Sequence, residues 1–266
     1  MIRFDHVSFE RGSMPVLRHL DFTIEEGERI AIVGPNGAGK TSTLKLCNGL
    51  YHPTEGAVYL DGTDTKALRA SAIAKTAGFL FQNPDRQIFS DTLEKELAFG
   101  LTIQGIEGEP ARQRIQELIQ EFGLDPGQNP LTASRGMRQR IALASIVATK
   151  PRLLLLDEPT TGLDYSARTQ MMEAIRRLNR DNGATVVIIT HDMALAQDFA
   201  SRVLVLVDGH LVADDTADAV LRDEALLARA SLAPPQMPAL LNRLGDLGRF
   251  DTMEDLVAYI QRRRSK

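Results

Sequence analysis

The sequence predicts an α/β fold with a largely parallel β-sheet. The first observation is that residues 34–41 match the pattern G-x-x-x-x-G-K-[ST] at every fixed position, between an apolar run at residues 30–33 and a helix-forming segment. The second is that short apolar runs alternate with helical segments in the second half of the chain, of which residues 153–156, all leucine, are the most apolar. Strands and helices that alternate around such a loop are typical of a parallel sheet covered by helices.

Two strands are predicted ahead of the loop, at residues 2–9 and 16–24, where apolar and polar residues partly alternate. Residues 11–15, Arg-Gly-Ser-Met-Pro, form a turn between them, so we expect an N-terminal antiparallel β part. After the loop and its helix, apolar runs bounded by turn residues predict strands at residues 57–60 and 78–81.

The chain changes to helical patterns between residues 83 and 150. Helices are predicted at residues 93–101, 111–122 and 136–148. In the second of these, apolar residues recur on one face and Pro110 stands at the start. Residues 83–150 are therefore predicted to form a helical subdomain inserted between sheet elements.

The remaining strands are predicted at residues 153–156, 185–189 and 203–207, with a helix at residues 165–179. These runs are almost wholly apolar, as expected of strands covered on both faces. From Ala217 onward, helical pieces are separated by prolines and a glycine, which indicates a small addition. The predicted organisation is an α/β domain at residues 1–215 and a small helical C-terminal extension at residues 216–266.

Composition excludes several classes of protein. The 266 residues suffice for one large domain with a small appendage, and a net charge of −4 provides no basic surface for tracking nucleic acid. No run approaches the ~18 apolar residues that span a bilayer, so another chain would supply any membrane span. Cys47, the single cysteine, excludes an internal disulfide and fits a reducing compartment. Charges within the first six residues argue against a signal peptide.

The loop at residues 34–41 has the composition of a phosphate cradle. Glycine lacks a Cβ, so the backbone can curl until successive N–H groups face one anion, and the following helix directs its positive end there. Lys40 is predicted to reach the β- and γ-phosphates of a nucleotide, and the Thr41 hydroxyl to ligate Mg²⁺. An incidental glycine-rich turn is disfavoured by the strand before and the helix after. The residues predicted to bind the nucleotide here are Gly34, Pro35, Asn36, Gly37, Ala38, Gly39, Lys40, Thr41 and Ser42.

Two carboxylates close the tetraleucine strand. Asp157 is predicted to hold Mg²⁺, since a carboxylate at the C-terminal edge of a parallel sheet lies beside the phosphate loop. Glu158 would point to the other side and polarise the attacking water. By itself this pair would be interpreted as a polar strand end; the phosphate loop in the same chain favours catalysis.

The segment at residues 157–164, Asp-Glu-Pro-Thr-Thr-Gly-Leu-Asp, strongly resembles the second nucleotide motif and D-loop of ATP-binding-cassette (ABC) ATPases. Thr190-His191-Asp192 resembles their switch histidine, and Gln82 after an apolar strand resembles their Q-loop glutamine. The motifs occur in family order over about residues 1 to 215, so the chain is identified as a member of this family.

The resemblance implies a dimer in which each nucleotide lies between the phosphate loop of one cassette and the signature motif of the other. It implies that Gln82 serves Mg²⁺ and the attacking water, that Glu158 is the base and that His191 contacts the γ-phosphate of ATP. Asp164 would lie at the dimer interface and couple the two sites. The partner would be a second copy or a paralogue.

The signature departs from the usual Leu-Ser-Gly-Gly-Gln. It aligns with Ala133-Ser134-Arg135-Gly136-Met137, in which Ser134 and Gly136 remain candidates for contacting the partner's nucleotide. Arg135 and Met137 replace the second glycine and the glutamine, either as a tolerated variant or because this signature serves a weaker site in a heterodimer.

A second departure concerns the nucleobase. The family usually stacks adenine on an aromatic residue near the end of the first strand, and Arg11 stands at that position. A guanidinium can also stack on a planar ring, so Arg11 is the candidate contact, with weaker selectivity between bases expected.

Residues 82–89, Gln-Asn-Pro-Asp-Arg-Gln-Ile-Phe, closely resemble the extended Q-loop of energy-coupling-factor (ECF) importers, which include cobalt and nickel transport ATPases. Residues 226–245 are similar to the helical extension of those ATPases, which is associated with their pairing. The resemblance implies a peripheral subunit at the cytoplasmic face of the cell membrane. Its partners would be a transmembrane coupling protein, which Asp85, Arg86 and Gln87 are candidates to contact, and a small membrane protein that binds a metal ion or a vitamin.

Three alternatives stay open. A soluble ABC ATPase acting on nucleic acid or ribosomes would normally carry a second cassette, a coiled coil or a basic face. A phosphate-loop kinase or GTPase gives no reason for Gln82, Ser134, Asp164 and His191 to occur in this order. A cassette that binds nucleotide without hydrolysing it is harder to distinguish from an active ATPase by sequence alone. The cargo itself is not encoded in an ATPase.

Overall fold

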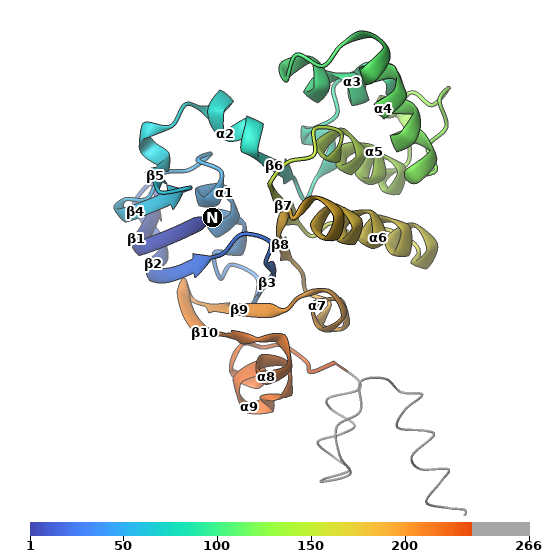
Figure 1. Cartoon of the computed structure of the whole chain (residues 1–266). Coiled ribbons are helices and arrows are strands. Elements are labelled where there is room, and N and C mark those ends of the chain that lie inside the picture. The colour runs from blue at the N-terminus through green and yellow to red at the C-terminus, as the bar shows by residue number, and fades with distance from the viewer. Residues whose placement is uncertain (236–266) are drawn as a thin grey trace, which may run out of the picture.

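A computed structural model describes residues 1–235 and confirms an α/β fold with two β-sheets (Figure 1). Four strands form an antiparallel sheet in the order β2-β1-β4-β5. Six strands form a second sheet in the order β10-β9-β3-β8-β7-β6, in which every pair except β10–β9 is parallel. The N-terminal antiparallel part and the largely parallel sheet are therefore both present.

The elements follow the predicted order. The strands are β1 (Ile2–Arg11), β2 (Met14–Ile24), β3 (Arg29–Val33), β4 (Glu55–Leu60), β5 (Thr63–Asp64), β6 (Ala77–Leu80), β7 (Leu153–Asp157), β8 (Thr185–Ile189), β9 (Arg202–Val207) and β10 (His210–Thr216). The α-helices are α1 (Lys40–Cys47), α2 (Ala70–Thr76), α3 (Leu93–Ile103), α4 (Gly108–Glu121), α5 (Arg135–Val147), α6 (Tyr165–Asn182), α7 (Met193–Phe199), α8 (Ala217–Arg222) and α9 (Glu224–Arg229). Short 3₁₀ turns are η1 (Thr65–Ala67), η2 (Pro84–Arg86) and η3 (Pro130–Thr132).

The six-stranded sheet is the middle layer, which explains its apolar strands. Successive residues of β3 point to opposite faces: Ala31 and Val33 pack with residues of α3 to α7, whereas Ile30 and Ile32 pack with α1 and the antiparallel sheet. Strands β7 and β8 divide their side chains between the two cores in the same way. Because both faces of this sheet are buried, the sequences of its strands do not alternate between apolar and polar residues.

Helices α3, α4 and α5 pack together beside the parallel sheet, where α5 also contacts α6 and β6 (Figure 1). The predicted helices of this block all exist, within three residues of the expected starts. Pro110 stands in the first turn of α4, where a missing N–H is tolerated. The treatment of residues 83–150 as an inserted subdomain, and the domain boundaries given above, stay predictions.

Four helices and strands were not predicted, and one of them, β5, has only two residues. Helix α2 buries only Ile73, and α7 is short, so neither has a strong apolar period. Strand β10 is polar and partly exposed, and it exists because it pairs antiparallel with the buried strand β9 after a turn at Asp208 and Gly209. Helices α8 and α9 lie in the described part of the C-terminal extension, which ends at residue 235; residues 236–266, including residues 240–245, lie outside the described residues. Within residues 1–235, no helix has the length and apolar character needed to cross a membrane.

Candidate nucleotide-binding site

The phosphate loop joins β3 to α1 through a backbone that only glycine permits at two points. Gly34 has φ of 148°, and a Cβ there would lie 2.0 Å from the carbonyl oxygen of Leu206. Gly39 has φ of 96°, and a Cβ there would lie 2.3 Å from Leu17 Cδ2. The loop is thus held against β9 and β2, and α1 begins at Lys40 with its N-terminus facing the cavity described below.

The Lys40 side chain is buried against the backbone of the phosphate loop. Its Nζ donates to the carbonyl oxygens of Gly34 and Pro35, at 2.8 Å each. Burial lowers the pKa of the ammonium, while the nearby carboxylates of Glu158 and Asp157 act in the opposite direction. These neutral carbonyl partners can be exchanged for phosphate oxygens, which would be stronger partners for a cation.

Asp157 ends β7 two strands away from the loop and meets Thr41, whose hydroxyl donates to its Oδ2 at 2.9 Å. The carboxyl group is buried, and burial raises its pKa, against the effect of the Thr41 hydrogen bond. A hydroxyl and a carboxylate oxygen held together beside a phosphate loop are the donor set that Mg²⁺ prefers. The residues present therefore fit a magnesium ion.

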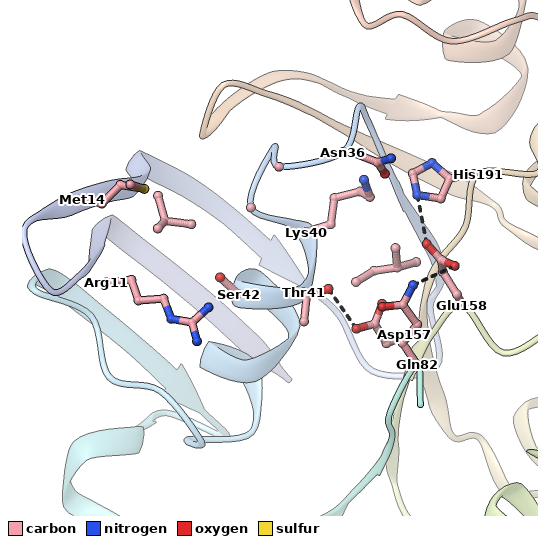
Figure 2. Close-up of a pocket in the computed structure, with 14 residues that line it drawn as sticks. Arg11, Met14, Asn36, Lys40, Thr41, Ser42, Gln82, Asp157, Glu158 and His191 are labelled. Carbon is pink, nitrogen blue, oxygen red and sulfur yellow. Dashed lines mark hydrogen bonds and ion pairs between the residues drawn. The ribbon is translucent and has the colours of Figure 1, made fainter. Parts of the chain in front are cut away.

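Glu158 is held by Gln82 and His191, which come from two other segments (Figure 2), and by Thr161 of its own loop. Its Oε2 accepts hydrogen bonds from Gln82 Nε2 and Thr161 Oγ1, at 3.1 Å each, and its Oε1 lies 2.9 Å from His191 Nε2. Its backbone is in the left-handed region, with φ of 50°, and its N–H donates to the carbonyl oxygen of Ile189 at 3.1 Å. That conformation costs about 1–2 kcal/mol for a residue with a Cβ, so the surrounding contacts must impose it.

These side chains surround one pocket of about 610 Å³ (Figure 2). At one end it is lined by Arg11, Met14 and Val16, and at the other by Gln82, Glu158 and their neighbours. The predicted site residues that line it are Arg11, Asn36, Gly37, Gly39, Lys40, Thr41, Ser42, Gln82, Asp157, Glu158 and His191. Gly34, Pro35 and Ala38 belong to the same loop without lining the pocket.

Ser134, Gly136 and Asp164 do not line this pocket. Ser134 caps α5, since its Oγ accepts from the N–H of Met137 at 3.3 Å, and Asp164 caps α6 through the N–H of Ala167 at 2.8 Å. The two helix starts adjoin each other: a Cβ at Gly136 would lie 3.3 Å from Leu163 Cδ2. The signature and the D-loop therefore form one surface in this chain, separate from its own phosphate loop.

Sequence reasoning missed Met14, Val16, Ile189 and the Thr161 contact. The first two follow from register, because Arg11 pairs with Met14 across the β1–β2 hairpin and places that strand end over the pocket. The turn predicted at residues 11–15 was the sequence signal that could have placed Met14 beside Arg11. Among residues 1–235, no Phe, Tyr or Trp lines the pocket; Tyr51 is stacked on Phe9, with ring centroids 5.1 Å apart.

Comparisons with known proteins agree with this geometry. The family model for ABC transporters matches residues 17–161. The energy-coupling factor transporter ATP-binding protein EcfA1 of Caldanaerobacter subterraneus subsp. tengcongensis is 38% identical over 276 residues, covering 98% of this chain and 99% of the relative. A longer relative from the same organism is 40% identical over 245 residues, and this chain spans 42% of its length.

Two solved structures share the fold. The dimeric ATP-binding cassette MJ0796, in a post-hydrolysis state bound to ADP and Pi, superposes with a TM-score of 0.74 at 30% identity, covering 82% of this chain and 99% of that one. CbiO1 from Clostridium perfringens, part of the transporter complex CbiONQ, superposes with a TM-score of 0.75, covering 91% of this chain and 98% of that one. At 24% identity, the second similarity concerns the fold alone.

Proposed function

The chain belongs to the ATP-binding subunits of ABC transporters, which are ATP hydrolases, and we propose that it powers an importer of the ECF type. The observation that carries the proposal is the match to EcfA1 along 98% of this chain and 99% of the relative. The Q-loop resemblance at residues 82–89 points the same way. The proposed cargo is a metal ion, cobalt or nickel, or a vitamin.

Hydrolysis is proposed to use the residues gathered around the pocket. Lys40 and the loop N–H groups bind the β- and γ-phosphates of ATP. Thr41, Asp157 and Gln82 would hold Mg²⁺, which supplies charge neutralisation on the phosphates when bound. Glu158 orients the attacking water and accepts its proton. His191 Nε2 lies beside Glu158 Oε1 in this structure. When ATP is bound, it would turn toward the γ-phosphate, so that a contact with the substrate replaces the contact with Glu158.

A dimer follows from the separation of the two surfaces. Ser134, Gly136 and Asp164 lie away from this chain's own pocket, so we propose that they act on the nucleotide of a second cassette, either a copy or a paralogue. The dimeric form of MJ0796 supports this arrangement. If the altered signature weakens one site, Arg135→Gly with Met137→Gln should raise turnover of the assembled complex about two- to fivefold. Unchanged turnover would favour a tolerated variant.

The coupling protein is proposed to dock beside the Q-loop. Phe89 and Phe99 form an exposed edge-to-face pair, with ring centroids 4.6 Å apart, and Ile103 is exposed on the same helix as Phe99. An apolar surface of this kind suits an amphipathic helix. Of the three polar candidates, Arg86 is exposed, whereas Gln87 Oε1 accepts from the Phe81 N–H and Asp85 pairs with Arg138.

The decisive experiment is affinity purification of the tagged chain from detergent-solubilised native membranes, with each co-purifying chain identified. We expect a transmembrane coupling protein and a small membrane protein that binds the cargo, together with a second ATPase if the dimer is mixed. A Phe89→Asp, Phe99→Asp variant should lose the coupling protein and retain the second ATPase. Recovery of soluble or nucleic-acid-associated partners alone would overturn the proposal in favour of a soluble ABC ATPase.

A further inference from the structure

Arg138, on the first turn of α5, connects two loops that are far apart in sequence. Its Nε lies 2.9 Å from Oδ1 of Asp85, three residues after Gln82. Its Nη1 donates to the carbonyl oxygens of Ala133, at 2.9 Å, and Leu131, at 3.5 Å. These two carbonyls belong to the backbone that leads directly into Ser134. One side chain therefore holds both the Q-loop and the approach to the signature.

Each loop is already a small rigid unit before Arg138 joins them. On the Q-loop side, Asn83 Oδ1 accepts from the Asp85 N–H, which caps the 3₁₀ turn η2. On the signature side, Ser134 caps α5 through Met137. Local hydrogen bonds fix the shape of each loop, so the guanidinium between them sets how the two units sit relative to each other.

The chemistry of arginine suits this role. A guanidinium is planar and rigid, so an ion pair at Nε and hydrogen bonds from Nη1 keep a constant mutual position; the Nε contact with Asp85 is an ion pair without hydrogen-bond geometry. The Arg138 side chain is mostly buried, with 23% of it exposed, so its ion pair is screened less than a fully exposed pair. Asp85 is 57% exposed and can be displaced from outside.

We propose that Arg138 is a positioning residue: it transmits a displacement of the Q-loop at Asp85 to Ser134 and the N-terminus of α5. The inference rests on the proposed function, in which Ser134 meets the partner's nucleotide. A protein that moves the Q-loop would in this way change the presentation of the signature without touching it.

Arg114 provides a matched control at the other end of α5. Its guanidinium donates to the carbonyl oxygens of Val147 and Ala148, and it pairs with Glu117 at 3.1 Å. The contacts are of the same kind as those of Arg138. However, Arg114 and Glu117 lie on one helix, α4, so this cluster joins α4 to α5 and does not reach the Q-loop.

The first test uses thiol labelling. Cys47, the chain's single natural cysteine, is fully buried. Ser134→Cys therefore creates the one exposed thiol in residues 1–235. In the full-length chain, Asp85→Asn should change the labelling rate of that thiol by a maleimide by about threefold or more, because the guanidinium that holds its loop loses the ion pair to the Q-loop. Glu117→Gln should leave the rate within about twofold of the parent. Equal rates for the parent and Asp85→Asn, or an equal change for Glu117→Gln, would overturn the proposal.

The second test is a double-mutant cycle on turnover of Mg-ATP by the full-length chain. Asp85→Asn and Arg138→Gln should each lower kcat about fivefold, with little change in KM or Tm, and the double variant should be no worse than either. Additive losses, or losses matched by falls in Tm, would mean that the ion pair is merely structural. If Arg138→Gln does not fold, labelling of the Asp85→Asn variant still decides. Neither test uses a membrane partner, so a negative result in either one would not overturn the ECF proposal. Failure to co-purify a coupling protein would, in turn, not overturn the role proposed for Arg138.

Discussion

The two ends of the nucleotide pocket are built differently. At the phosphate end, Lys40 and Asp157 are only 7% and 3% exposed, and Glu158 is bonded to three side chains. At the base end, Met14 is 70% exposed, and the exposed Arg11 side chain makes no hydrogen bond or ion pair with residues 1–235. Under the proposed function, preorganisation is concentrated where charge would develop in phosphoryl transfer, and the end proposed to receive the base is left open.

The sharpest test of the rigid end is Glu158→Gln. Glutamine keeps the shape and can keep the Gln82 and Thr161 contacts, but it cannot accept the proton of the attacking water. We expect kcat for Mg-ATP to fall by about 10²–10⁴-fold, with ATP binding retained. Turnover within tenfold of the parent would remove Glu158 from the role of base.

Asp157→Asn is expected to act in two directions. Its amide oxygen remains, but the lost charge should weaken Mg²⁺-dependent turnover by about tenfold or more. Burial raises the pKa of Asp157 in the folded chain, so the ionised form is disfavoured there and its cost to stability is present at neutral pH. The variant should therefore raise Tm of the ligand-free chain at pH 7 by about 2–4 °C.

The pH dependence of the Tm difference between Asp157→Asn and the parent is a separate check on the sign of that effect. A raised folded pKa favours folding below the unfolded pKa, about 3.9, and that advantage is lost as pH rises through the folded pKa. The difference in Tm between Asp157→Asn and the parent should thus shrink toward acid pH. A gap that grows on acidification would contradict the assignment of burial as the main cause.

The base end should respond more weakly. Arg11→Tyr would supply a ring on which adenine can stack, and we expect ATP affinity to rise about three- to tenfold with kcat unchanged. Arg11→Ala serves as its control and should lower the affinity for ATP and GTP alike. Equilibrium binding of both nucleotides measures the effect, and unchanged affinities in both variants would remove Arg11 from the site.

The smallest effect is expected for Met14→Ala. The side chain is mostly exposed and covers the base end from the opposite strand of the hairpin. Its removal should weaken ATP binding by about twofold, since little buried apolar area is lost. A loss comparable to that of Lys40→Ala would show that the base end is as organised as the phosphate end, and the comparison above would fail.

The fold was predictable because its signals are local. The phosphate loop, the tetraleucine strand and the order of strands and helices each occupy one short stretch, and burial of the parallel sheet on both faces explains the apolar runs. Strand β10 and helix α2 have weak local patterns and were missed, since pairing with β9 stabilises β10 and burial of Ile73 stabilises α2. Ser134 and Asp164 were selected for their motifs, and their capping role could also have been read from residue type.

The sequence by itself thus determined the fold class, the phosphate loop and the two carboxylates at the end of β7. Tertiary structure decided which distant segments share a side chain: Glu158 with Gln82 and His191, and Asp85 with Arg138. The physical reason is that a motif depends on residues adjacent along the backbone, whose geometry is fixed locally. A contact between segments depends on register and packing of the whole sheet, which no single stretch encodes.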